Sequence, residues 1–261
     1  MARLDSELVA RGLARSRQRA KEMILSGNVT VNGKTAKKAS DEVSAEDVIE
    51  SSESESYVGR GALKLEKAAE EFGLDFNGKV CLDIGASTGG FTDFMLQNGA
   101  AKVFAVDTGH GQLAQRLIDD DRIVNMEGTD IRDVSADDLG GQADIISVDV
   151  SFISLTKILA KVYELLKDGA VAAVLIKPQF EAGRSDIGKR GIVKDKKVHI
   201  RVLTEIDSFA QAVGFITEQY TYSPVRGGSG NIEYLVKLRK AAGEPKIHDF
   251  KELTDSSFTK L

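Results

Sequence analysis

Residues 80–96 constrain the fold of this chain more than any other segment. They read Val-Cys-Leu-Asp-Ile-Gly-Ala-Ser-Thr-Gly-Gly-Phe-Thr-Asp-Phe-Met-Leu, so an apolar run leads into a glycine-rich turn and then into a second apolar run. A strand, a turn and a helix in this order let backbone N–H groups approach a ligand closely, since glycine has no side chain to block them. The segment therefore predicts the binding loop of a nucleotide-like cofactor.

Helix-like and strand-like segments alternate along the chain from about Gly61 onward. This alternation predicts a mostly parallel sheet, in a Rossmann-like, doubly wound α/β fold that binds ligands at the carboxyl ends of its strands. We expect strands at 80–84, 102–107, 144–148, 170–176, 216–222 and 233–238, and helices at 63–72, from 91, at 155–166 and at 199–213.

Residues 1–40 form a basic head, with a formal charge of +6 against −11 for the rest of the chain. We expect a helix from Leu4 that Gly12 ends, a second helix that Ser16 caps, and a hairpin that turns at Asn32-Gly33. The charge suits a polyanion such as nucleic acid, although a solvated basic face would also explain it. The candidate RNA-binding residues of the head are Arg3, Arg15, Arg17, Arg19, Lys21 and Lys34.

An acidic stretch at 41–55 and the run Ser-Ser-Glu-Ser-Glu-Ser at 51–56 place a domain boundary after the head. The predicted domains are 1–56, an RNA-binding domain with its linker, 57–242, a larger catalytic domain, and 243–261, a C-terminal tail. No apolar run approaches the roughly 20 residues that span a bilayer, and we expect a soluble, cytoplasmic protein. Cys81 has no second cysteine to pair with, and the three scattered histidines predict no metal site.

The glycine-rich turn itself indicates which cofactor binds. Its spacing differs from the G-x-G-x-x-G fingerprint of dinucleotide sites. Asp83 would repel a pyrophosphate, whereas it would favour the cationic groups of S-adenosylmethionine, so this cofactor is the better prediction. The alternative is a plain strand-to-helix turn. The expected cofactor-binding residues are Asp83, Gly85, Ser87, Gly89, Gly90 and Phe91, with Asp107 for the ribose hydroxyls, unless it caps a helix, and Asp130 for the adenine amino group, unless it serves a surface turn.

Polar residues stand at three further strand ends, where packing alone does not require them. Asp149 follows the strand 144–148, Lys177 follows 170–176, and Glu233 opens the last predicted strand. We expect the three side chains to converge on one edge of the sheet. Lys177 is then a candidate general base, or else one partner of an ion pair that closes the edge.

Several motifs resemble the TlyA family of ribosomal RNA methyltransferases, and the resemblance covers nearly the whole chain. The basic head is similar to a small RNA-binding domain that a ribosomal small-subunit protein shares with many RNA-modifying enzymes. The motifs that carry the resemblance are Arg60-Gly-Ala-Leu-Lys64-Leu, Asp83-Ile-Gly-Ala-Ser-Thr-Gly-Gly-Phe-Thr92, Val148-Asp149-Val-Ser-Phe-Ile-Ser154, Ile176-Lys177-Pro-Gln-Phe-Glu181 and Gly230-Asn-Ile-Glu233-Tyr.

The resemblance implies a reaction, because the catalytic domain is similar to the FtsJ-type ribose 2'-O-methyltransferases. Their Lys-Asp-Lys-Glu tetrad corresponds by motif to Lys64, Asp149, Lys177 and Glu233. The implied reaction is S-adenosylmethionine-dependent 2'-O-methylation of ribose, with ribosomal RNA or ribosomal subunits as the partner. The loop after Lys177 either holds the target nucleotide or is a solvated loop; its candidate residues are Phe180, Arg184, Lys189 and Arg190.

Two other function classes compete with this prediction. Some family members are named haemolysins, so a membrane-active protein is one alternative, although the sequence offers no long apolar stretch for it. A ribosome-binding module without catalysis is the other, and it leaves the polar tetrad unexplained.

Overall fold

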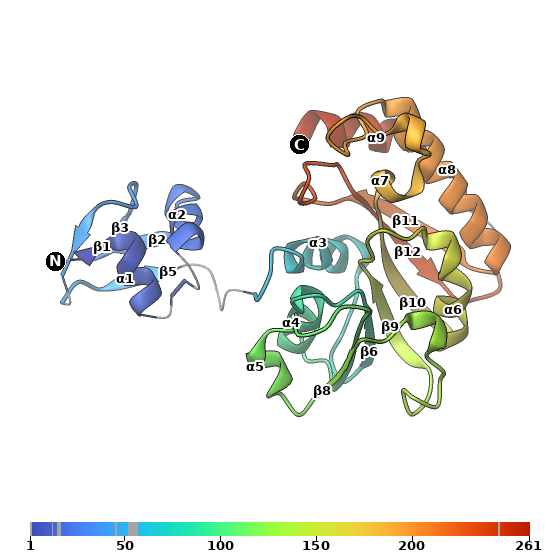
Figure 1. Cartoon of the computed structure of the whole chain (residues 1–261), viewed down its shortest axis with the longest axis horizontal. Helices are drawn as coiled ribbons and strands as arrows, with labels where there is room; N and C mark the ends of the chain where they lie inside the picture. Colours follow the sequence, from blue (N-terminus) through green and yellow to red (C-terminus); the bar gives the residue numbers. More distant parts are fainter. Residues whose placement is uncertain (1, 12, 15–16, 45, 52–56, 245) are drawn as a thin grey trace. The chain divides into compact units, whose positions relative to one another are not determined.

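The computed structural model describes residues 2–11, 13–14, 17–44, 46–51, 57–244 and 246–261. The chain folds into two compact units, Met1–Tyr57 and Val58–Leu261 (Figure 1). The predicted roles of Gly12, Arg15 and Ser16 lie outside the described residues, and so does the side chain of Arg19.

The first unit packs two helices against short strands. Leu4 and Leu8 lie one helical turn apart and are buried together with Met23 and Ile24 of the second helix. Asn32 and Gly33 adopt positive φ angles of 51° and 76°, which confirms the predicted hairpin. The elements of this unit are β1 (Ala2–Arg3), α1 (Leu4–Ala10), α2 (Arg17–Leu25), β2 (Val29–Val31), β3 (Lys34–Thr35), β4 (Glu42–Val43) and β5 (Ile49–Ser51).

The second unit is built on a seven-stranded sheet, as far as the chain is described, with the order β11-β12-β10-β9-β6-β7-β8. The five strands from β10 to β8 are parallel, and β12 runs antiparallel to both β10 and β11. This confirms the predicted fold class. The strands are β6 (Val80–Ile84), β7 (Lys102–Asp107), β8 (Ile123–Glu127), β9 (Ala143–Val148), β10 (Leu166–Ile176), β11 (Ile216–Tyr222) and β12 (Tyr234–Arg239).

Helices cover both faces of this sheet, with α3 and α4 on one side and α6 and α8 on the other (Figure 1). In α8 the residues Val202, Leu203, Ile206 and Ala210, at intervals of one, three and four positions, fall on one face of the helix and are buried in the core. The helices are α3 (Ala62–Phe72), α4 (Gly90–Gln97), α5 (Gln115–Ile118), α6 (Leu159–Leu165), α7 (Pro178–Glu181), α8 (Lys196–Val213) and α9 (Phe250–Lys260).

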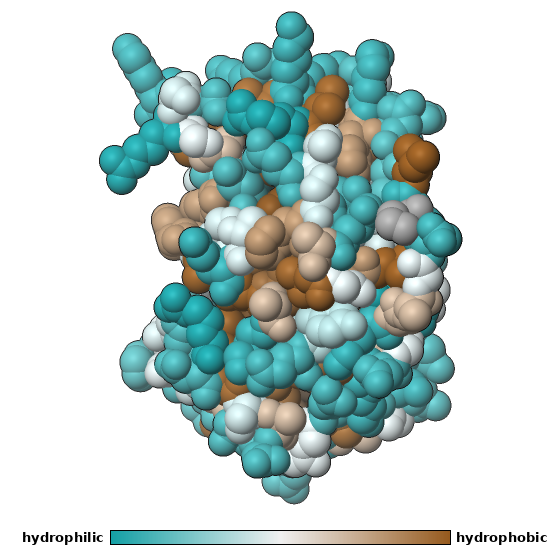
Figure 2. Space-filling model, turned by 90° about the vertical axis from the view of Figure 1, so that its right-hand side faces the viewer, coloured by the Kyte–Doolittle hydropathy of each residue, from teal (hydrophilic) through white to brown (hydrophobic). Residues whose placement is uncertain are grey.

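The face that carries α8 is covered mainly by hydrophilic residues, with hydrophobic residues gathered in a smaller area (Figure 2). Among the described residues, no helix combines the length and the apolar composition that a membrane span requires.

Most of the segment expected as a C-terminal tail is a packed helix of the second unit. Asp249 caps α9, and Phe250, Thr254 and Ser257 are buried on one side of it. The hydroxyl of Tyr234 lies 2.9 Å from Nδ1 of His199 and 3.1 Å from Oγ of Ser257, so polar contacts join β12 to α8 and α9. Segment 250–260 therefore belongs to the core that supports the edge of the sheet.

Candidate active site

Strand direction explains why three of the predicted catalytic residues meet. The parallel strands β9 and β10 end at Val148 and Ile176, directly before Asp149 and Lys177. Strand β12 runs the opposite way and begins at Tyr234, which is paired with Ile176. The start of β12 thus lies beside the end of β10, and Glu233 reaches the same edge.

The fourth residue, Lys64, comes from α3, which approaches the glycine-rich turn closely. A Cβ on Gly90 would lie only 3.1 Å from the backbone nitrogen of Ala62, so glycine at this position lets α3 pack against the turn. Lys64 is buried, with 9% of its surface exposed. The approach of the two backbones brings its amine to the edge where Asp149, Lys177 and Glu233 meet.

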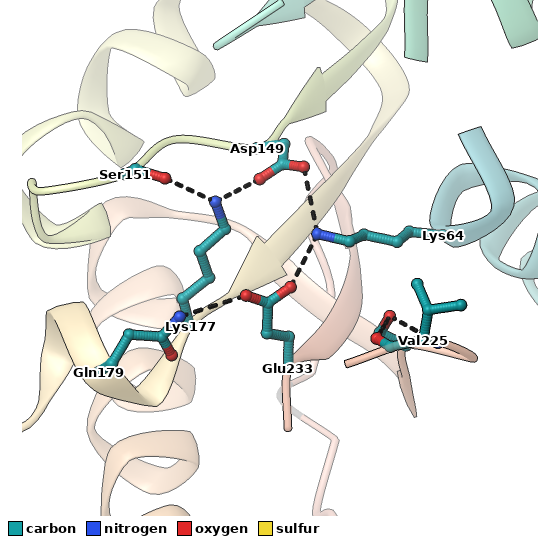
Figure 3. Close-up of polar contacts among 8 residues, drawn as sticks. Lys64, Asp149, Ser151, Lys177, Gln179, Val225 and Glu233 are labelled. Carbon is teal, nitrogen blue, oxygen red and sulfur yellow. Dashed lines mark hydrogen bonds and ion pairs between the residues drawn. The ribbon is translucent and has the colours of Figure 1, made fainter. Parts of the chain in front are cut away.

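The four side chains form one chain of alternating charges (Figure 3). Nζ of Lys64 lies 2.7 Å from Oε2 of Glu233 and 3.5 Å from Oδ2 of Asp149, and Nζ of Lys177 lies 2.5 Å from Oδ1 of Asp149. This last contact is an ion pair without an aligned hydrogen bond among the residues that the structure describes. The structure thus brings together the residues that the sequence predicted.

The two lysines have different surroundings. Burial by itself lowers the pKa of Lys64, but the charges and hydrogen bonds of Asp149 and Glu233 outweigh it and raise the pKa above its usual value. Lys64 is therefore held as an ammonium group. Lys177 contacts one of these carboxylates and the hydroxyl of Ser151 instead of two carboxylates.

Two residues of the site were missed by the sequence analysis. Oγ of Ser151 accepts a hydrogen bond from Lys177 at 2.9 Å, and Nε2 of Gln179 donates to Oε1 of Glu233 at 3.2 Å (Figure 3). Ser151 follows the tetrad residue Asp149 by two positions, and Gln179 follows the tetrad residue Lys177 by two positions. Both residues lie within motifs that were quoted from the sequence, Val148–Ser154 and Ile176–Glu181, and that was the usable signal.

A cavity of about 470 Å³ lies at the carboxyl ends of β6 and β7. Gly85 has a φ of 84°, and a Cβ there would lie 2.5 Å from the carbonyl oxygen of Asp149, so no larger residue fits. The carboxylate of Asp107 accepts from the backbone nitrogens of Ser87 at 2.8 Å and Gly109 at 2.7 Å. A carboxylate has about four lone-pair sites, so Asp107 retains acceptor capacity for ligand hydroxyls.

The remaining predicted cofactor residues are placed in three ways. Asp130 lines the cavity, and its hydrogen bonds with Arg132 lower its pKa to about 2. Gly90 and Phe91 line a neighbouring cavity of about 260 Å³ that also contains Lys64 and Lys177. Gly89 precedes α4 with a φ of 93°, and a Cβ there would collide with side chains of α5 and of the loop before it.

Asp83 is placed differently from the prediction. It is fully buried and lines neither cavity; its carboxylate accepts hydrogen bonds from Thr92 at 2.7 Å and Ser147 at 2.9 Å. Burial raises the pKa of Asp83 to about 6. Asp83 was expected to contact the cofactor, whereas in this structure its strand is covered on both faces and its carboxylate holds the turn from behind.

An aromatic pair stands at the rim of the larger cavity. Phe152 has a positive φ of 65°, is 91% exposed, and its ring centroid lies 5.0 Å from that of Phe180. A strained backbone conformation and an exposed aromatic ring both cost stability, and such residues are concentrated at functional sites. Phe152 was not predicted as a site residue, although it lies in the quoted motif Val148–Ser154.

The candidate RNA-binding residues of the first unit differ in their contacts. Arg3 and Arg17 contact the buried carboxylate of Asp5, at 3.0 Å and 3.1 Å, so both have a structural partner. Lys21 and Lys34 are exposed. Within the described part of the chain, no group of three or more His, Cys, Asp and Glu side chains is placed to hold a metal ion.

Comparisons with known proteins agree with this architecture. Residues 57–240 match the FtsJ-like methyltransferase family, and residues 2–49 match the S4 domain. A solved structure from Streptococcus thermophilus that carries a hemolysin name superposes with a TM-score of 0.77 at 40% identity, covering 99% of this chain and 96% of that one.

Two curated relatives are similar over most of their lengths. The 16S/23S rRNA (cytidine-2'-O)-methyltransferase TlyA of Mycobacterium tuberculosis is 43% identical over 91% of this chain and 90% of its own. Hemolysin A of Brachyspira hyodysenteriae is 42% identical over 89% of this chain and 98% of its own. With an S4 domain followed by an FtsJ-like methyltransferase domain, this chain belongs to the TlyA family.

Proposed function

We propose that this chain transfers a methyl group from S-adenosylmethionine to the 2'-hydroxyl of a cytidine ribose in ribosomal RNA. The observation that carries the proposal is the meeting of Lys64, Asp149, Lys177 and Glu233 beside the larger cavity. The substrate class is supported by relatives named as rRNA cytidine-2'-O-methyltransferases.

The residues of the larger cavity suit S-adenosylmethionine. Asp107 offers carboxylate lone pairs for ribose hydroxyls, and Ile131, Ile153 and Ile158 offer an apolar wall for an adenine ring. Gly85 and Ser87 line both cavities, so the loop that holds them borders the cofactor and the lysines at once. When bound, the cofactor supplies an electrophilic methyl group on a positively charged sulfur.

The tetrad can activate a ribose hydroxyl, which is a poor nucleophile until its proton is removed or shared. Lys177 as a neutral amine accepts this proton while the 2'-oxygen forms its bond to the methyl carbon. The bond from that carbon to sulfur breaks, and its electron pair stays on sulfur. Lys64, held as an ammonium, donates to the hydroxyl oxygen and positions it, and Asp149 and Glu233 orient the two lysines.

Features outside the tetrad support an RNA substrate. The exposed ring of Phe152 beside Phe180 suits stacking with a base, and the exposed cations Arg184, Lys189 and Arg190 suit phosphates. The S4 unit supplies a second basic surface, through Lys21 and Lys34. On this proposal the protein binds ribosomal RNA or a ribosomal subunit, and it acts in the cytoplasm, where that substrate is found.

The hemolysin names of some relatives do not carry a second candidate function for this chain. No observation on the described residues favours membrane damage, and the tetrad would have no use in it. A ribosome-binding module without catalysis likewise leaves the contacts between the four charged residues unexplained.

The proposal is tested by incubating the purified protein with methyl-labelled S-adenosylmethionine and ribosomal subunits from cells that lack the gene. Digestion of the RNA to nucleosides should give labelled 2'-O-methylcytidine. Label on a base, or no label in RNA from either subunit, would contradict the proposal. A parallel test for release of dye from liposomes examines the membrane-active alternative, and no release is expected.

A further inference from the structure

Ser151 lies where the two cavities meet. The larger cavity and the smaller, lysine-containing cavity share four lining residues, which are Gly85, Ser87, Asp149 and Ser151. Of these, Ser151 has the side chain that contacts Lys177 without carrying a charge. Ser151 thus borders the proposed cofactor cavity, and its hydroxyl contacts the proposed base.

The contacts of Lys177 leave one direction open at its nitrogen. A tetrahedral amine has three positions besides its bond to carbon. Oγ of Ser151 accepts a hydrogen bond from one of them at 2.9 Å, and the carboxylate of Asp149, with Oδ1 2.5 Å from the nitrogen, lies beside a second as its ion-pair partner (Figure 3). The third position faces neither residue.

This geometry has the same result in both protonation states. In the ammonium form, the third position holds an N–H group. In the neutral form, the negative charge of Asp149 disfavours a lone pair turned towards it, and the Ser151 oxygen keeps its N–H donor, so the lone pair takes the third position. Without the Ser151 hydroxyl, the amine of Lys177 can rotate, so that the lone pair and an N–H group exchange places. The Lys177 side chain is then held by Asp149 and no longer by Ser151.

The loop that contains Ser151 is anchored by backbone hydrogen bonds two positions before and four positions after this residue. The backbone nitrogen of Asp149 donates to the carbonyl oxygen of Ile84 at 2.9 Å, and Glu181 accepts from the backbone nitrogen of Leu155 at 2.9 Å. Among the described residues, Lys177 is the one hydrogen-bonding partner of the Ser151 side chain. A residue in an anchored loop whose hydroxyl contacts one catalytic side chain is typical of residues that orient a catalytic group.

We propose that Ser151 is a positioning residue that aims the amine of Lys177 at the target 2'-hydroxyl. The inference rests on the proposed function and deepens it. It concerns the chemical step and not the binding of either substrate, because Ser151 acts through Lys177.

The test compares Ser151→Ala with Ser151→Thr, which keeps the hydroxyl at an exposed position. For Ser151→Ala we expect kcat of methyl transfer to fall about tenfold, the size of one lost hydrogen bond. KM for the RNA and Kd for S-adenosylmethionine should stay within about twofold of the wild type, and Ser151→Thr should recover most of kcat. Crystal structures should show a displaced Lys177 amine in the alanine variant and an unchanged one in the threonine variant.

Equal kcat values for Ser151→Ala and wild type would overturn the inference, and so would a change confined to KM or an unmoved Lys177. Failure of the proposed function is a different result, because the wild type itself would then transfer no methyl group to ribosomal RNA, and the inference would fall with it. A wild type that is active, an inactive Lys177→Ala variant and a fully active Ser151→Ala variant would remove the inference and leave the function standing.

Discussion

Lys64 donates a hydrogen bond to Glu233 over 2.7 Å, although the two residues are 169 positions apart in the sequence. The contact exists because β12 runs antiparallel to β10 and begins where α3 approaches the glycine-rich turn. It joins the first helix of the second unit to the last strand of the sheet. Together with Asp149, it also keeps Lys64 charged.

Replacing Lys64 with Met should destabilise the fold, because Glu233 would be left buried without its cation. We expect a loss of about 3 kcal/mol in the free energy of unfolding, measured with urea. The control Glu70→Ala on the exposed side of the same helix should change it by less than about 0.5 kcal/mol. Adding Glu233→Gln to Lys64→Met should recover part of the loss; additive effects would show that the two residues are not coupled.

Asp83→Asn should change how stability depends on pH. The pKa of Asp83 is about 6 in the folded protein against 3.8 as its ordinary value, so the folded state binds the proton more tightly. The contribution of Asp83 is therefore fully present below about pH 4 and is lost as pH rises through 6. From pH 4 to pH 7, urea unfolding should show the asparagine variant gaining about 3 kcal/mol relative to the wild type. Parallel stability curves would contradict the assignment.

Gly85→Ala should weaken the binding of S-adenosylmethionine, because a Cβ there would displace the backbone of Asp149. The matched control is Gly140→Ala, since Gly140 also has a positive φ but no atom within 4 Å of the added Cβ. Both variants carry backbone strain, so any difference between them reports the collision. By isothermal titration we expect at least a tenfold loss of affinity for Gly85→Ala alone, a loss of at least about 1.4 kcal/mol. Equal affinities would show that the turn does not form the cofactor site.

Charge reversal at Lys21 and Lys34 should weaken binding to ribosomal RNA and reduce its dependence on salt. Each lost phosphate contact should lower the slope of log K against log salt concentration by about one. The same reversal at Lys102, exposed at the start of β7, serves as the control. A salt slope equal to that of the wild type would exclude these two lysines from the RNA interface.

The sequence predicted the parts of the site that depend on strand ends. Asp149, Lys177 and Glu233 follow or precede apolar runs, so their meeting at one edge follows from the direction of the strands. Lys64 was assigned through family resemblance alone, because nothing local links α3 to this edge. Ser151 and Gln179 were missed because neutral side chains gain a role only from what they contact.

Other differences have physical causes that a linear sequence conceals. Asp83 faces Thr92 and Ser147 because both faces of β6 are covered, so a polar residue in that strand needs internal partners. The edge strand β8 was not among the predicted strands. It is only partly buried and carries two polar residues, so its sequence lacks a clear apolar run. Arg3 and Arg17 looked like free cations, but the buried carboxylate of Asp5 pairs with both.

The rate of methyl transfer by Lys177→Ala tests the central claim most directly, namely that Lys177 accepts the proton of a ribose 2'-hydroxyl. Formation of 2'-O-methylcytidine in ribosomal RNA should fall at least about a hundredfold, the range of a lost general base. Binding of S-adenosylmethionine should persist, and Lys102→Ala should retain wild-type rates. Lys177→Arg should be as inactive as the alanine variant, because arginine does not give up its proton. A Lys177→Ala or Lys177→Arg variant that methylates at the wild-type rate would contradict the account.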